Sequence, residues 1–269
     1  MPKVKVGDIN MYYEVHGKGE PLVMINVASG NTGYYYRVIK APIPGYKLVI
    51  FDNRGAGKTD APAPPYSTAM MADDLAGLLD NTGIDSAHIM GTSLGGMIAQ
   101  EFALRYPKKV KSLFLASTYC GSWSTIASPE TMEAMQSMAS LPPKEMMMAT
   151  LRVSMSQEFC DKNPGLLDEI AEHMLQEPLQ PQGMMGQMSA AIGHNTCEGL
   201  PEIKAPTLVI AGEADRVVPA ENSRILAAGI PGAELVILKG KGHMFWFEAE
   251  SETNRIMLDF LRRHSTKKA

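Results

Sequence analysis

The sequence predicts an α/β fold: a mostly parallel, twisted sheet with helices on both faces and a helical cap insertion. Short apolar runs alternate with helical periods in the first 118 residues, the alternation stops over residues 119–200, and it then resumes. Strand–helix alternation is typical of a parallel sheet that is covered on both faces. We therefore predict a core formed by residues 1–118 and 201–269 and a cap formed by residues 119–200.

The first part of the core contains a hairpin, four further strand-like segments and two helical periods. Alternating apolar residues around Gly7-Asp8 predict a hairpin over residues 3–15. Runs bounded by Gly, Pro, Asn or Ser predict strands at residues 22–25, 47–51, 88–90 and 112–116. Apolar residues at helical spacing predict one helix from Met71 to before Gly83 and another from Met97 to before Pro107.

The second part of the core repeats this pattern. Residues 207–211 and 234–238 are expected to form strands, with helices from about 220 to 229 and from about 252 to 263. Within residues 119–200 no strand is expected, and helices are predicted after three proline-containing pairs: Ser128-Pro129, Pro142-Pro143 and Pro164-Gly165.

The cap is rich in methionine. Eleven of the 20 methionines lie between Met132 and Met188. Methionine side chains are flexible and fill irregular spaces, so the cap is either a helical subdomain packed by them or a lid that lines an apolar pocket.

Composition excludes several classes of protein. A chain of 269 residues with 45% hydrophobic and 20% charged residues is globular, and its net charge of −4 is spread without long blocks. We therefore expect neither nucleic acid nor membrane as a partner. Three cysteines are too few for a disulfide framework, and no apolar run has the length of a signal peptide or a membrane span. A soluble, cytoplasmic protein is expected, while its oligomeric state cannot be inferred.

Ser93 is the candidate nucleophile. Residues 91–95 read Gly-Thr-Ser-Leu-Gly and lie between a predicted strand and a predicted helix. A serine on such a sharp turn needs small flanking residues, and its hydroxyl is exposed beside the N-terminus of the helix. The backbone N–H of Leu94 would then donate to the oxyanion of a tetrahedral intermediate.

A serine hydroxyl requires a base, and the base requires an orienting acid. His243 lies in a glycine-rich loop directly after the predicted strand at 234–238 and is the candidate base. Asp215 follows the strand at 207–211 and is the candidate acid, with Glu213 as the alternative. The order serine, aspartate, histidine along the chain is the order expected for a serine turn of this kind.

The other five histidines are weaker candidates. His16, His88 and His264 are expected to be structural or terminal. His173 and His194 belong to the cap and are either structural or in contact with substrate.

Five segments together resemble the α/β-hydrolase family, and within it the compact carboxylesterases and 3-oxoadipate enol-lactone hydrolases. The resemblance covers about residues 1–118 and 201–264. It rests on residues 13–17, 51–60, 91–97, 212–219 and 242–248. It implies an α/β-hydrolase fold, a serine hydrolase activity, and the roles of nucleophile for Ser93, acid for Asp215 and base for His243. It also implies that Asp52 and Arg54 brace a loop near the site, and a structural ion pair is expected for them.

One segment departs from the family pattern. Family members usually carry His-Gly after the third strand, followed by the second oxyanion donor, whereas this chain has Asn26-Val27-Ala28-Ser29-Gly30. By position the second donor is the backbone N–H of Ala28. Because a glycine and a histidine are replaced, Ser29 or Gly30 could instead lie closer to the substrate.

These features predict a serine-dependent carboxylic ester hydrolase that forms an acyl-enzyme and needs neither metal nor organic cofactor. The expected substrate is a small, largely apolar ester, because Arg152 is the only arginine in the cap and no arginine pair is present for a diacid. Candidate substrate contacts are Tyr35, Trp123, Met244 and Trp246. Alternatives on the same triad are a C–C bond hydrolase, a lactonase, a perhydrolase, or a hydrolase-like ligand receptor with slow turnover.

Overall fold

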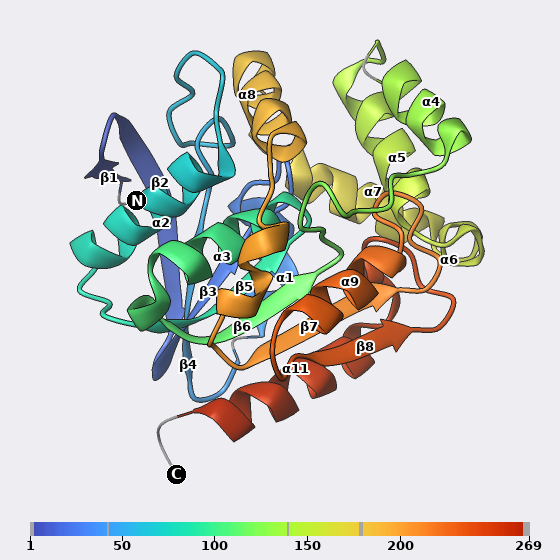
Figure 1. The fold of residues 1–269 in the computed structure, drawn as a ribbon. Helices are drawn as coiled ribbons and strands as arrows, with labels where there is room; N and C mark the ends of the chain where they lie inside the picture. Colours follow the sequence, from blue (N-terminus) through green and yellow to red (C-terminus); the bar gives the residue numbers. More distant parts are fainter. Residues whose placement is uncertain (1–2, 42, 139, 178–179, 266–269) are drawn as a thin grey trace.

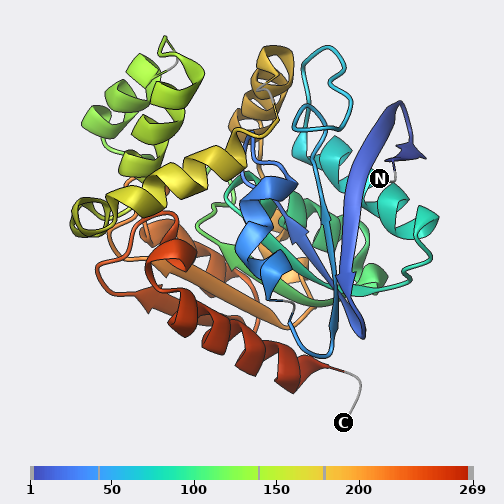
Figure 2. The same ribbon diagram turned by 180° about the vertical axis from the view of Figure 1, so that it is seen from behind.

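The computed structural model describes residues 3–41, 43–138, 140–177 and 180–265, which form one eight-stranded sheet covered by helices (Figures 1 and 2). The strands are β1 Lys3–Val6, β2 Ile9–Gly17, β3 Glu20–Ile25, β4 Tyr46–Phe51, β5 Ala87–Thr92, β6 Val110–Ala116, β7 Thr207–Gly212 and β8 Glu234–Leu238. Their order across the sheet is β1-β2-β4-β3-β5-β6-β7-β8. β1 pairs antiparallel with β2 and β2 with β4, and the remaining pairs are parallel. The predicted hairpin and the mostly parallel sheet are confirmed.

Helices cover both faces of the sheet, as expected. The helices of the core are α1 Tyr36–Lys40, α2 Thr68–Asn81, α3 Leu94–Arg105, α9 Glu221–Gly229, α10 Phe245–Glu248 and α11 Glu250–His264. Within the described residues, short 3-10 helices lie at η1 Thr32–Tyr35, η2 Pro107–Lys109 and η3 Cys197–Glu202. α2, α3 and α9 pack on one face, whereas α1 and α11 pack on the other. The helices over residues 32–40 and 245–248 were not predicted from the sequence.

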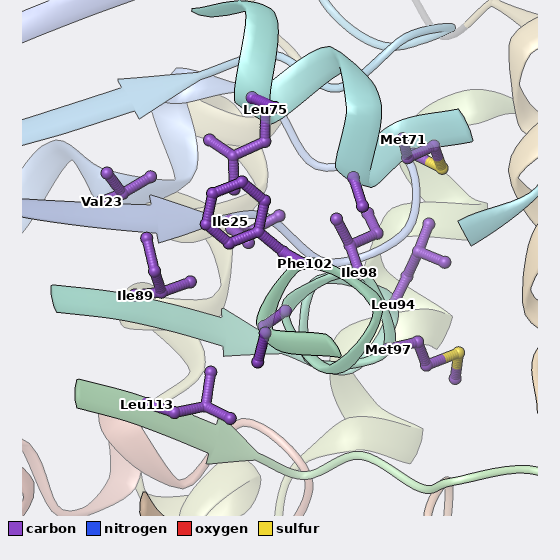
Figure 3. Close-up of a cluster of buried hydrophobic side chains, with 14 of the residues drawn as sticks. Val23, Ile25, Met71, Leu75, Ile89, Leu94, Met97, Ile98, Phe102 and Leu113 are labelled. Atoms are coloured by element: carbon purple, nitrogen blue, oxygen red, sulfur yellow. The ribbon is translucent and has the colours of Figure 1, made fainter. Parts of the chain in front are cut away.

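The central helix α3 is buried along most of its length. Phe102 and Ile98 lie between α2 and the strands β3 and β5, in contact with side chains such as Leu75 and Ile89 (Figure 3). Both α3 side chains are fully buried. Truncating a buried phenylalanine to alanine typically costs about 3–5 kcal/mol, so this packing holds the N-terminus of α3 firmly at the edge of the sheet.

The residues between β6 and β7 form a cap, and β6 and β7 are themselves neighbours in the sheet. The cap helices are α4 Pro129–Met138, α5 Pro143–Ser154, α6 Gln157–Lys162, α7 Pro164–Met174 and α8 Pro181–Ile192. In the part of the cap that the structure describes there is no strand. α4, α5 and α7 begin at the prolines that predicted them, whereas α6 and α8 were not predicted. Met147 and Leu151 of α5 and Leu167 of α7 are buried.

Helix α8 lies against the core through two glycines. A Cβ on Gly183 would lie 2.0 Å from the carbonyl oxygen of Gly55, and a Cβ on Gly186 would lie 2.4 Å from the ring of Tyr66. The backbone of α8 therefore approaches the loop after β4 more closely than any side chain would allow. Figure 1 shows α8 standing beside this loop, apart from α4 and α5.

Substitution of Gly183 tests this close approach. Gly183→Ala is expected to destabilise the protein by about 1–3 kcal/mol because the added methyl group overlaps the Gly55 backbone, despite the higher helix propensity of alanine. Gly165→Ala in α7 is the matched control, since its Cβ would meet nothing within 4 Å. It is expected to stabilise the protein by about 0.5–1 kcal/mol. Urea denaturation measures both effects, and stabilisation by Gly183→Ala would contradict the close packing.

None of the described helices is long and apolar enough to cross a lipid bilayer.

Candidate active site

Ser93 lies on a strained turn between β5 and α3. Its φ of 53° and ψ of −118° are backbone angles that residues other than glycine rarely adopt. The Ser93 N–H donates to the carbonyl of Ala116 at 2.9 Å, and the Ser93 carbonyl accepts from the Thr118 hydroxyl at 2.8 Å. The Ser93 hydroxyl caps no amide of α3, and the residue is partly exposed between buried neighbours. The turn is thus fixed by its backbone, which leaves the hydroxyl available for chemistry.

Both glycines flanking Ser93 are required by contacts. A Cβ on Gly91 would lie 2.1 Å from the Gly95 carbonyl oxygen, and a Cβ on Gly95 would lie 2.2 Å from the Ile25 carbonyl oxygen. The second contact shows that the turn packs directly against the end of β3. The pattern of residues 91–95 therefore reflects a turn for which larger residues have no space.

His243 and Asp215 form a buried pair. His243 Nδ1 and Asp215 Oδ2 lie 2.7 Å apart, and only 5% and 6% of the two residues is exposed. The other carboxylate oxygen of Asp215 accepts the N–H groups of Val217 and Val218. These bonds orient the carboxylate, and the pairing of Nδ1 leaves Nε2 as the nitrogen that can exchange a proton with substrate or nucleophile.

The alternative acid Glu213 does not contact His243. Glu213 is exposed, and its carboxylate accepts a hydrogen bond from the N–H of Gly240 at 3.0 Å. Of the two carboxylates considered from the sequence, Asp215 is thus the one that the fold brings to the histidine.

The segment directly after β6 connects the serine turn with the histidine loop. Besides the bonds of Ala116 and Thr118 to Ser93, the Ser117 hydroxyl donates to the carbonyl of His243 at 2.9 Å. Ser117 has a positive φ of 45°, and its N–H donates to the carbonyl of Ile210 in β7. Three consecutive residues therefore hold Ser93 and His243 at the same edge of the sheet.

Residues 26–31, here called the oxyanion loop, follow β3. The N–H of Ser29 donates to Gln187 Oε1 at 2.6 Å, and the N–H of Gly30 donates to the carbonyl of Val27. Two of the three amides considered as second oxyanion donors are thus already bonded. Among the described residues, the Ala28 N–H has no such partner.

Asp52 and Arg54 do not form the ion pair expected from the sequence. Asp52 instead accepts the N–H groups of Thr32 and Lys58, and burial raises the pKa of its carboxyl to about 6. Arg54 forms two hydrogen bonds with Asp74, at 2.6 and 2.8 Å. The expectation was wrong because Asp52 is buried among backbone amides, which satisfy its carboxylate without a cation.

Three of the four candidate substrate contacts are associated with one large apolar cluster. Tyr35 and Met244 belong to this cluster, which extends from the sheet and α11 to α5 and α7, and Trp246 packs against it. Trp123 lies elsewhere, in the segment before α4, and is 52% exposed.

The two histidines of the cap have partners of their own. The ring of His173 stacks on Tyr36 at 3.9 Å. His194 lies buried between the hydroxyls of Thr68 and Thr196, and burial lowers its pKa to about 4. Both therefore have structural contacts with the core.

Two side chains to which the sequence analysis assigned no role connect the cap with the site. Gln187 of α8 accepts from the oxyanion loop, as described above. Glu248 of α10 accepts the N–H of Gly242, next to His243, and also the N–H of Ser156 in the cap. Gln187 lies in no motif, and Glu248 closes the segment 242–248 without an assigned role, because the partners of both residues are brought together only by the fold.

The chain matches two family models and is similar to known hydrolases. Residues 20–146 match the family model described as alpha/beta hydrolase fold, and residues 188–269 match the model described as TAP-like protein. The chain is 32% identical to a 2-hydroxy-6-oxononadienedioate/2-hydroxy-6-oxononatrienedioate hydrolase of Burkholderia vietnamiensis, covering 95% of this chain and 92% of that protein.

Two solved structures are similar over nearly the whole chain. The enol-lactonase from Burkholderia xenovorans LB400 has a TM-score of 0.85 at 23% identity, covering 97% of this chain and 100% of that one. Est816, described as an N-acyl homoserine lactone degrading enzyme, has a TM-score of 0.82 at 30% identity, covering 96% and 100%. The predicted fold and the resemblance inferred from the sequence are both confirmed.

Proposed function

The chain belongs to the α/β-hydrolase family and is a hydrolase, and we propose that it is a serine-dependent carboxylic ester hydrolase acting through an acyl-enzyme. The observation that carries the proposal is the buried pair of His243 and Asp215, held by the same segment that fixes the strained turn of Ser93. A serine, a histidine and a carboxylate in this order are the groups that acyl transfer requires.

The proposed reaction has two steps. In the first, Ser93 Oγ attacks the ester carbonyl carbon while His243 Nε2 takes the hydroxyl proton. The oxyanion accepts hydrogen bonds from the N–H groups of Leu94 and Ala28, and His243 then protonates the departing alcohol. Asp215 holds Nδ1–H and stabilises the imidazolium. In the second step, His243 removes a proton from water, which attacks the acyl carbon. The bond from that carbon to Ser93 Oγ then breaks, His243 returns the proton to Oγ, and the acid is released.

The side chains of the cap favour a substrate whose acyl group is small and largely apolar. Buried methionines such as Met147 and Met155 lie in the apolar cluster that also contains Tyr35 and Met244. Arg152, the only arginine of the cap, is exposed, and its backbone carbonyl accepts from Arg216. An apolar environment disfavours a charged acyl group, because an unpaired carboxylate would lose its hydration there.

A lactone is a second candidate substrate. The similarity to Est816 at 30% identity favours it, since that protein is described as degrading an N-acyl homoserine lactone. A lactone is a cyclic ester, so the same acyl-enzyme forms and the alcohol remains attached to the acyl group.

A panel of p-nitrophenyl esters tests the proposed function. We expect continuous turnover, with kcat/KM highest for uncharged chains of short to medium length and at least about tenfold lower for a succinate half-ester, because the charged end must be desolvated. Stoichiometric release without turnover would instead support a ligand receptor, and a preference for the half-ester would contradict an apolar pocket. N-acyl homoserine lactone, assayed by titration of released acid, distinguishes the lactonase.

A further inference from the structure

We propose that Gln187, on the cap helix α8, is a positioning residue for the oxyanion loop: it fixes the loop so that the Ala28 N–H is presented to the oxyanion. The inference deepens the proposed function and rests on it. It makes the docking of the cap a requirement for stabilising the transition state.

The Gln187 side chain is completely buried and uses both ends of its amide. Its Oε1 accepts the N–H of Ser29 at 2.6 Å, and its Nε2 donates to the carbonyl of Arg54 at 2.8 Å. Exchanging the two ends would place a donor against the Ser29 N–H and an acceptor against the Arg54 carbonyl. The orientation of the amide is therefore fixed by its partners.

The hydrogen bond from Ser29 to Gln187 falls on a loop residue with strained backbone angles. The hydrogen bond from the Gly30 N–H to the Val27 carbonyl closes a four-residue turn, and Ser29, its third residue, has a φ of 58°. Turns with a positive φ at the third position favour glycine there, because a side chain makes the conformation strained. A serine in this place needs an external contact to hold the turn, and Gln187 supplies it.

The turn also determines which amides can reach the oxyanion. When Gln187 engages Ser29 and the turn engages Gly30, the remaining amide is that of Ala28. If the turn relaxes to a negative φ at Ser29, the peptide planes on either side of Ser29 rotate and the bond that closes the turn is lost. The backbone of Ala28, which lies inside the turn, then no longer holds its N–H in a fixed direction. Electrostatic stabilisation of an oxyanion depends on donors that are already oriented, so catalysis should suffer more than binding.

Helix α8 provides a rigid support for Gln187. Besides the glycine contacts with Gly55 and Tyr66, the Gln180 side chain donates to the carbonyls of Gly57 and Thr59. Gln180 thus docks the same helix to the same core loop, and its described hydrogen bonds do not reach the oxyanion loop. This makes Gln180 a matched control for Gln187.

The experiment compares Gln187→Met and Gln180→Met for hydrolysis of p-nitrophenyl butyrate and for inhibition by an alkyl trifluoromethyl ketone, which forms an oxyanion on a reactive serine. We expect Gln187→Met to lower kcat by about 10- to 100-fold, with KM within about threefold of wild type. The inhibition constant of the ketone should rise by about the same factor by which kcat falls. Gln180→Met is expected to keep kcat within about twofold.

A second substitution separates positioning from simple stability. Glycine accepts a positive φ without strain, so Ser29→Gly in the Gln187→Met background should recover at least about threefold of the lost kcat. If Gln187→Met alone does not fold, the single variant Ser29→Gly is compared with the double variant Ser29→Gly/Gln187→Met instead. The kcat values of these two variants are expected to differ by less than about threefold.

Three results would overturn the inference: an unchanged kcat in Gln187→Met, an equal loss in Gln180→Met, or a loss that Ser29→Gly does not reduce. If the wild-type enzyme itself shows no turnover that depends on Ser93, the proposed function fails and the inference fails with it. Active wild-type enzyme with unchanged variants would reject the role of Gln187 alone.

Discussion

Replacing Ser93 by alanine is expected to lower kcat for p-nitrophenyl butyrate by about 10⁵- to 10⁶-fold, because alanine has no hydroxyl with which the proposed nucleophile forms the acyl-enzyme. Residual hydrolysis above the rate in water would come from the oxyanion donors and from substrate binding. A steady-state assay with enough enzyme to measure the slow variant gives the ratio directly.

Two controls separate chemistry from folding in this experiment. Ser93→Gly should be as inactive as the alanine variant yet at least as stable as wild type, because glycine adopts φ 53° without strain. Ser122→Ala removes an exposed serine of the cap that bonds to Asn195, and it should retain full activity. Activity within tenfold of wild type in either Ser93 variant would reject the nucleophile.

Replacing Asp215 by asparagine is expected to lower kcat by about 10⁴-fold. The asparagine keeps the size of the side chain but cannot stabilise the imidazolium. It can also turn its amide N–H₂ toward Nδ1, which then becomes an acceptor, so that Nε2 carries the proton and cannot act as the base. The pH dependence of kcat should change together with its magnitude, because the tautomer of His243 changes.

Glu213→Gln is the matched control for Asp215→Asn. Glu213 lies two residues earlier on the same loop, and its carboxylate accepts only the Gly240 N–H among the described contacts. We expect Glu213→Gln to keep kcat within about twofold of wild type, since the substituted carboxylate makes no described contact with His243. A larger loss in Glu213→Gln than in Asp215→Asn would reverse the assignment of the acid.

The sequence predicted the strands of the core well, because buried parallel strands are short apolar runs with clear boundaries. The predicted strand at 88–90 extends in the structure to Ala87–Thr92. It was predicted short because Gly91 and Thr92 resemble the start of a turn. The contact between a Cβ on Gly91 and the Gly95 backbone explains why a glycine occupies the end of this strand.

Helix α8 was not predicted, for a physical reason. Gly183 and Gly186 each lower helix propensity by about 1 kcal/mol relative to alanine, so local preference opposes the helix. The helix forms nevertheless, because the same two glycines let α8 lie directly against Gly55 and Tyr66. A helix that depends on packing against a distant loop leaves no local signal.

Only part of the candidate site could be predicted from the sequence. The loops of Asp215 and His243 could be predicted because each follows a parallel strand, and such strands end at one edge of the sheet. The contact between Gln187 and Ser29 spans 158 residues and crosses from the cap to the core. No spacing within the chain encodes such a contact.

Covalent labelling tests the central claim most directly. A fluorophosphonate reacts with a serine only when a base activates it, and mass spectrometry of the digested protein identifies the modified residue. We expect one adduct per chain on the peptide that carries Ser93, no adduct in Ser93→Ala, and slow labelling in Asp215→Asn. An adduct on another serine, or unchanged labelling rates in Asp215→Asn, would contradict the proposed triad.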